Sequence, residues 1–93
     1  MSTKEIQSSL FATAHAYQCA ALVEYLSARN PRATGFHALA ARRMADRAWL
    51  GFQSLATDDT LDYQQVDDTL DGVADCAESA GRILTAYVMQ SND

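Results

Sequence analysis

The chain has 93 residues, with 12 Asp and Glu against 7 Lys and Arg, a net charge of -5 and a sequence pI near 4.7. This length predicts one domain, residues 1–93, with a modest core and no deep catalytic cleft. No apolar run is long enough to cross a membrane, and the polar N-terminus lacks the apolar core of a signal peptide. We therefore expect a cytosolic protein whose 2 cysteines are free thiols.

The composition predicts an all-α protein. Alanine occupies 17 positions, whereas the chain has 4 Gly and 1 Pro. Alanine is the best helix former and proline the worst, so few breaks are expected. Two breaks stand out, one at Pro31 and one over residues 57–60, where the residue types favour caps and turns. The sequence therefore predicts a three-helix antiparallel (up-down-up) bundle, with helices over about 3–28, 34–56 and 61–89.

The first helix carries large apolar residues at helical spacing. Ser2 and Glu5 have the spacing of a capping box, which favours a helix start near Thr3. The large residues predict one broad apolar face towards the core, which leaves Ser9, Thr13 and Cys19 outside it. The residues predicted to form this core face are Ile6, Leu10, Phe11, Ala14, Tyr17, Ala21, Leu22 and Tyr25.

The second helix has apolar residues on two sides. Thr34 is a candidate cap, with Gly35 in the first turn. One side is a seam predicted to face the core, made of Ala41, Met44, Ala48, Gly51 or Phe52, and Leu55. The opposite side groups three large apolar residues with two arginines, namely Phe36, Leu39, Arg43, Arg47 and Leu50. Either the first helix covers this second side, or it binds a protein partner or a second copy of the chain.

The third helix carries the most regular pattern of the sequence. Its apolar residues are spaced alternately by four and three, which predicts an uninterrupted seam. The seam consists of Val66, Leu70, Val73, Ala77, Ala80, Leu84 and Tyr87. Because its centre is small, we expect a close antiparallel pairing with the second helix, Ala48 lying near the level of Ala77. Residues 90–93 are expected to fray.

Charge is distributed unevenly along the chain. Residues 1–57 carry a net charge of +3, whereas residues 58–93 carry -8. Five acidic side chains project from the third helix opposite its seam: Asp67, Asp68, Asp71, Asp75 and Glu78. They form either a solvated helix face or a surface that attracts a basic partner and thereby raises the rate of association.

No residue pattern of an enzyme is present. The sequence lacks a glycine-rich phosphate loop and a nucleophile elbow, and neither acidic stretch matches an EF-hand, so we expect no enzyme, no cofactor and no metal. His15 and Cys19 leave a zinc site as a minor alternative.

The function predicted from the sequence is therefore a non-enzymatic protein-protein interaction module. It would regulate or inhibit a basic protein partner and could form a homodimer. The alternative is a small nucleic-acid-associated protein that uses Arg42, Arg43 and Arg47, which the acidic net charge disfavours.

Overall fold

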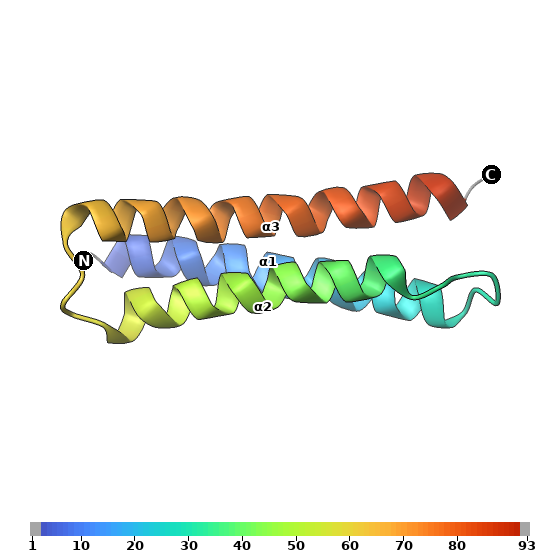
Figure 1. Cartoon of the computed structure of the whole chain (residues 1–93), viewed down its shortest axis with the longest axis horizontal. Helices are drawn as coiled ribbons and strands as arrows, with labels where there is room; N and C mark the ends of the chain where they lie inside the picture. Colours follow the sequence, from blue (N-terminus) through green and yellow to red (C-terminus); the bar gives the residue numbers. More distant parts are fainter. Residues whose placement is uncertain (1–2, 92–93) are drawn as a thin grey trace.

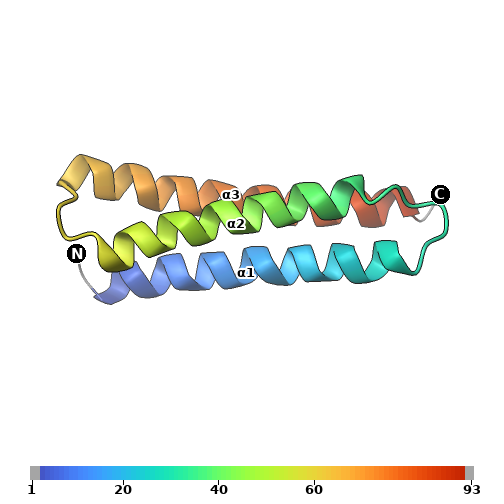
Figure 2. The same ribbon diagram turned by 60° about the horizontal axis from the view of Figure 1, so that its bottom comes forward.

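Three α-helices make up the part of the protein that the structure describes. The computed structural model describes residues 3–91, which form α1 (Thr3–Ala28), α2 (Phe36–Thr57) and α3 (Tyr63–Ser91). The helices run up, down and up, and each contacts the other two, in a rod of 47 × 17 × 17 Å (Figures 1 and 2). The predicted three-helix bundle is confirmed. Within residues 3–91, no helix has both the length and the apolarity needed to span a bilayer.

The helix boundaries differ slightly from the prediction. Helix α2 begins at Phe36 rather than Thr34, because Gly35 has a φ of 80°, a left-handed conformation outside the helical range. Helix α3 begins at Tyr63 behind a reciprocal cap. The Gln65 amide N–H donates to the Asp62 carboxylate at 2.8 Å, and the Asp62 N–H donates to the Gln65 side chain at 2.9 Å.

At its other end, α3 continues to Ser91, two residues beyond the predicted end near residue 89. The predicted cap at Ser2 and residues 92 and 93 lie outside the described part of the chain.

Helices α2 and α3 meet through the two predicted seams. Ala48, Val73 and Ala80 are buried, and a Cβ atom on Gly51 would lie 2.6 Å from the Val73 Cγ2. Since the helices are antiparallel, the contact between residues 51 and 73 places Ala48 level with residue 76, one residue from Ala77. The close pairing of α2 and α3 and its register are therefore as expected.

Helix α1 packs with the face opposite to the predicted one. Phe11, Leu22 and Tyr25, which were expected in the core, are 69%, 51% and 55% exposed. Leu10, Ala14 and Ala21 are exposed as well, while Ile6 and Tyr17 are half-buried. The side chains of α1 that are buried are Ser9, Thr13, Ala16, Cys19, Ala20 and Val23.

The reason for this reversal is the size of the side chains that α1 meets. The inner faces of α2 and α3 present alanines, including Ala45 and Ala80, so the three helices approach closely and leave room only for small residues. The buried hydroxyl groups do not oppose this packing, because they bond to carbonyls of α1. Ser9 donates to the Ile6 carbonyl at 2.9 Å, and Thr13 donates to the Ser9 carbonyl at 2.8 Å.

Candidate protein-interaction surfaces

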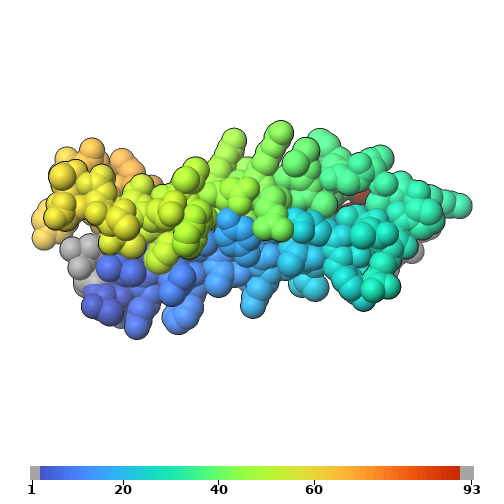
Figure 3. All heavy atoms as spheres, turned by 90° about the horizontal axis from the view of Figure 1, so that it is seen from below, coloured from blue at the N-terminus to red at the C-terminus, as the bar shows by residue number. Residues whose placement is uncertain are grey.

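The apolar and basic side of α2 remains uncovered. We call it the α2 strip, defined by Phe36, Leu39, Arg43, Arg47 and Leu50. Its three apolar side chains are 70%, 54% and 62% exposed in chain order, and both arginines are exposed. Helix α1 lies on another side of α2, so it does not cover the strip. Figure 3 shows the face on which α1 and α2 lie side by side, with side chains standing out from each helix.

A series of polar contacts joins α1 to α2 beside the strip. The Arg42 guanidinium donates to both carboxylate oxygens of Glu24, at 2.8 and 3.0 Å, and lies 5.5 Å from the centre of the Tyr17 ring. The Tyr17 hydroxyl donates to the Asp46 carboxylate at 2.7 Å. This hydrogen bond, together with burial and the negative charge of Asp46, raises the pKa of Tyr17. Arg42 and Asp46 are therefore engaged within the bundle.

Arg43 and Arg47, in contrast, point away from the bundle. Within residues 3–91 neither side chain forms an ion pair or a hydrogen bond. An arginine that gains nothing inside the fold remains available to a carboxylate or carbonyl of another molecule.

The acidic residues of α3 all lie on its outer face. We call this set, Asp67, Asp68, Asp71, Asp75 and Glu78, the acidic ridge; all five are exposed. Glu78 pairs with Arg82, the single basic residue of α3, and the Gln64 amide donates to Asp68 at 2.9 Å. The ridge is an exposed helix face suited to long-range attraction, and at its C-terminal end Glu78 also lines an open groove between α1 and α3, together with His15 and Cys19.

The outer face of α1 is a surface that sequence reasoning missed, because its residues were assigned to the core. It carries large apolar side chains along the whole helix. No charged residue occurs between Glu5 and Glu24, so this face is also nearly uncharged. The absence of charge was the one feature of the sequence that could have indicated a second apolar face on this helix. We define the α1 outer face by Leu10, Phe11, Gln18, Leu22, Tyr25 and Leu26, all of them exposed.

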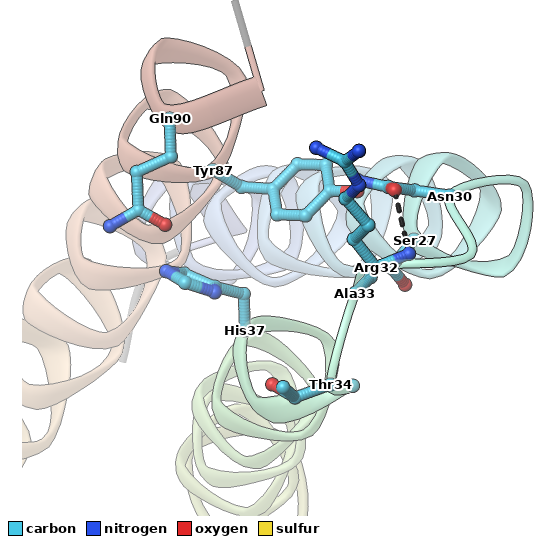
Figure 4. Close-up of a pocket in the computed structure, with 9 residues that line it drawn as sticks. Ser27, Asn30, Arg32, Ala33, Thr34, His37, Tyr87 and Gln90 are labelled. Atoms are coloured by element: carbon cyan, nitrogen blue, oxygen red, sulfur yellow. Dashed lines mark hydrogen bonds between the residues drawn. The ribbon is translucent and has the colours of Figure 1, made fainter. Parts of the chain in front are cut away.

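A pocket of about 210 Å³ lies at one end of the bundle, where residues 29–35 meet the last turns of α3 (Figure 4). The His37 and Tyr87 rings pack edge to face at 5.7 Å, and the Asn30 amide donates to the Tyr87 hydroxyl at 3.4 Å. The Asn30 side chain also accepts the Arg32 backbone N–H at 3.0 Å. These contacts fix the connection between α1 and α2.

The candidate soft ligands are not gathered into a metal site. Cys19 Sγ lies 3.5 Å from His15 Nε2, whereas Cys76 is half-buried on α3. Among residues 3–91, no group of three or more His, Cys, Asp or Glu side chains is placed to hold a metal ion. Cys19 is buried, contrary to the sequence prediction, and burial raises the pKa of its thiol, which opposes a nucleophilic role.

Comparisons of the chain with protein-family models, with curated proteins and with solved structures found no match.

Proposed function

We propose that the protein is a non-enzymatic protein-protein interaction module that docks a partner through the α2 strip. The observation that carries this proposal is the composition of the strip. Three large apolar side chains, each more than half exposed, lie beside Arg43 and Arg47, which lack ion-pair partners within residues 3–91. Apolar anchors beside arginines are typical of the centre of protein interfaces.

The acidic ridge supports a second part of the proposal, the overall charge of the partner. Five carboxylates on one helix face create a negative field that attracts a positively charged protein. The ridge lies on α3 and the anchors on α2, so we assign the ridge to steering and the strip to docking. The two cysteines are free and lie on different helices, which is typical of proteins of a reducing compartment. We therefore propose that the module acts in the cytosol.

The experiment uses the tagged protein to capture its partner from an extract of the source cell, and compares the wild type with two single variants. Leu50→Arg places a charge in the α2 strip, and Leu22→Arg places the same charge on the exposed surface of α1. With a captured partner purified, we expect Leu50→Arg to weaken its binding at least about tenfold, and Leu22→Arg to leave it unchanged. Equal binding by wild type and Leu50→Arg would contradict the proposal.

The ridge is tested on the same purified pair. Reversal of Asp71 and Asp75 to lysine should slow association at low salt and leave dissociation nearly unchanged. An association rate that does not respond to the reversal would remove the ridge from the mechanism.

Nucleic-acid binding is the weaker alternative on this geometry. Of the three arginines that it would use, Arg42 is engaged by Glu24, and only Arg43 and Arg47 remain to meet phosphates. A protein of net charge -5 gains little from two phosphate contacts. A shift of DNA or RNA mobility at low salt that is lost at high salt would favour this alternative.

A further inference from the structure

The α1 outer face presents a problem that the bundle itself does not solve. Phe11 is 69% exposed, and Leu22 and Tyr25 are more than half exposed, on the helix that carries no charge between Glu5 and Glu24. A helix that is apolar on all sides is normally buried on all sides. Here α2 and α3 bury only one side.

The order of residues along this face is nearly symmetric about Gln18. Leu10 and Leu26 lie eight residues before and after Gln18, and Phe11 and Tyr25 lie seven before and after it. The face therefore reads nearly the same in both directions. A two-fold interface requires a surface in which residue i of one copy meets residue j of the other and j meets i.

We propose that α1 pairs antiparallel with α1 of a second copy of this chain, about a two-fold axis near Gln18. Phe11 of each copy then meets Tyr25 of the other near the middle of the face, while Leu10 and Leu26 lie along its two edges. Leu22 lies opposite Ala14, so a large side chain fills the space above a small one. The two Gln18 amides meet at the axis, where each can donate and accept a hydrogen bond.

The charges of the molecule are compatible with this pairing. Glu24 is held by Arg42 on the α2 side of α1. Of the basic residues nearest the face, Lys4 lies at one end and Arg29 at the other, where its guanidinium lies 4.2 Å from the centre of the Tyr25 ring and can cover that ring at the rim of the contact. The acidic ridges lie on α3, a helix that takes no part in the contact, so the two net negative charges do not face each other.

Sedimentation equilibrium of the purified chain is the first test. We expect a monomer-dimer equilibrium that shifts with concentration. The matched variants are Phe11→Arg on α1 and Leu50→Arg on α2. Each places one positive charge at an exposed, large apolar residue, and the two residues are exposed to a similar degree. Phe11→Arg should raise the dimer dissociation constant at least about tenfold, and Leu50→Arg should leave it unchanged.

The same measurements identify the results that overturn the inference. If the chain remains monomeric up to millimolar concentration, the inference is overturned, because another kind of molecule or solvent then covers α1. The inference is also overturned if Leu50→Arg breaks the dimer and Phe11→Arg does not, since the interface is then on α2. Circular dichroism of both variants must show the helical content of the wild type. We expect this result because both positions are exposed, so neither substitution disturbs the core.

The orientation is tested by disulfide formation with oxidised glutathione. Phe11→Cys and Tyr25→Cys are made separately in a Cys19→Ala, Cys76→Ala background. We expect a cross-linked dimer only when the two proteins are mixed, because a disulfide requires Cα atoms about 4.4–6.8 Å apart. Cross-linking of either protein with itself would show a parallel or shifted pairing and overturn the proposed one.

This inference does not depend on the proposed function. Failure of partner binding is measured by Leu50→Arg, and failure of self-association by Phe11→Arg. Each variant is therefore the control for the other surface.

Discussion

Helices α1 and α3 lie side by side in one bundle and yet distribute their side chains in opposite ways. Helix α3 buries Val73 and Tyr87 and places its carboxylates in solvent. Helix α1 buries Thr13 and Ala20 and places Phe11 in solvent. The first arrangement is that of an amphipathic helix with one partner side. The second is that of a helix whose two sides both carry apolar residues, of which the bundle uses the smaller ones.

The difference shows that side-chain size selects the buried face when apolar character does not. The interior at the level of α1 is built from alanine on all three helices, with Ala16, Ala45 and Ala80 fully buried. Closely spaced helices gain dispersion contacts from their backbones and lose them if a large side chain separates the axes. The large residues of α1 are therefore better placed outside, where they remain available for other contacts.

The largest expected effect tests the buried face of α1. Ala20→Leu adds a large side chain to a fully buried position and should destabilise the fold by about 1–3 kcal/mol. Ala14→Leu makes the same change on the exposed side and should be nearly neutral. Urea unfolding of both variants measures the difference. If Ala14→Leu were the damaging change, the face predicted from the sequence would be the buried one after all.

The same exchange on α3 should give a slightly smaller difference. Ala77 is buried in the seam but 7% exposed, and Ala77→Leu should cost about 1–3 kcal/mol, towards the lower end. Ala74→Leu, on the outer side of α3, is the control and should leave the unfolding midpoint unchanged. Equal midpoints for the two variants would mean that α2 and α3 are not closely packed at this level.

A third comparison uses two glycines, Gly51 in the contact of α2 with α3 and Gly72 on the exposed side of α3. A Cβ at Gly51 would lie 2.6 Å from the Val73 side chain, which is buried and stiff. Gly51→Ala should therefore lower the free energy of unfolding by about 1 kcal/mol, after the gain from the better helix propensity of alanine is included. A Cβ at Gly72 would meet nothing within 4 Å, so Gly72→Ala should gain about 0.5–1 kcal/mol. Thermal unfolding of both variants should therefore give shifts of opposite sign. Shifts of the same sign would contradict the close approach at Gly51.

These contrasts also explain how far the sequence could be interpreted. The faces of α3 were predictable because charge alternates with apolar residues, so Asp71 and Asp75 indicate the outside as clearly as Val73 indicates the inside. Helix α1 offers no such marker between Glu5 and Glu24. The hydroxyl groups of Ser9 and Thr13 resembled surface groups, although each bonds to a carbonyl of its own helix and can be buried.

The candidate surfaces divide in the same way. The exposure of the acidic ridge follows from its charges, and the α2 strip was identified as one of two alternatives. The choice between these alternatives depended on which side of α2 receives α1. That is a tertiary property, set by the fit of three helices and not by the residues of α2 alone. The α1 outer face was hidden for the same reason.

The smallest expected effect concerns the polar contacts that attach α1 to α2. The Tyr17 hydroxyl donates to Asp46 at 2.7 Å, and this bond, with burial and the charge of Asp46, raises the pKa of Tyr17 above its ordinary value of 10.0, although the charge of Arg42 acts in the opposite direction. The folded state therefore favours the neutral phenol. Its contribution to stability is complete below pH 10.0 and is lost as the pH rises through the pKa of the folded state.

Tyr17→Phe should thus lower the free energy of unfolding by at most about 1 kcal/mol at neutral pH, the usual value of an exposed hydrogen bond. The difference between wild type and variant should shrink above pH 10.0, because only the wild type then loses the contact. Asp46→Asn provides the control, since it keeps the size of the side chain and removes the charge; in that background the pH-dependent part of the Tyr17→Phe difference should diminish. Urea unfolding at neutral pH and above pH 10.0 measures the free energy of unfolding of each protein. A difference that stays constant across the alkaline range would show that the Tyr17 hydroxyl does not contact Asp46 in solution, and that the Arg42–Glu24 pair is then the polar contact that attaches α1 to α2 at this level.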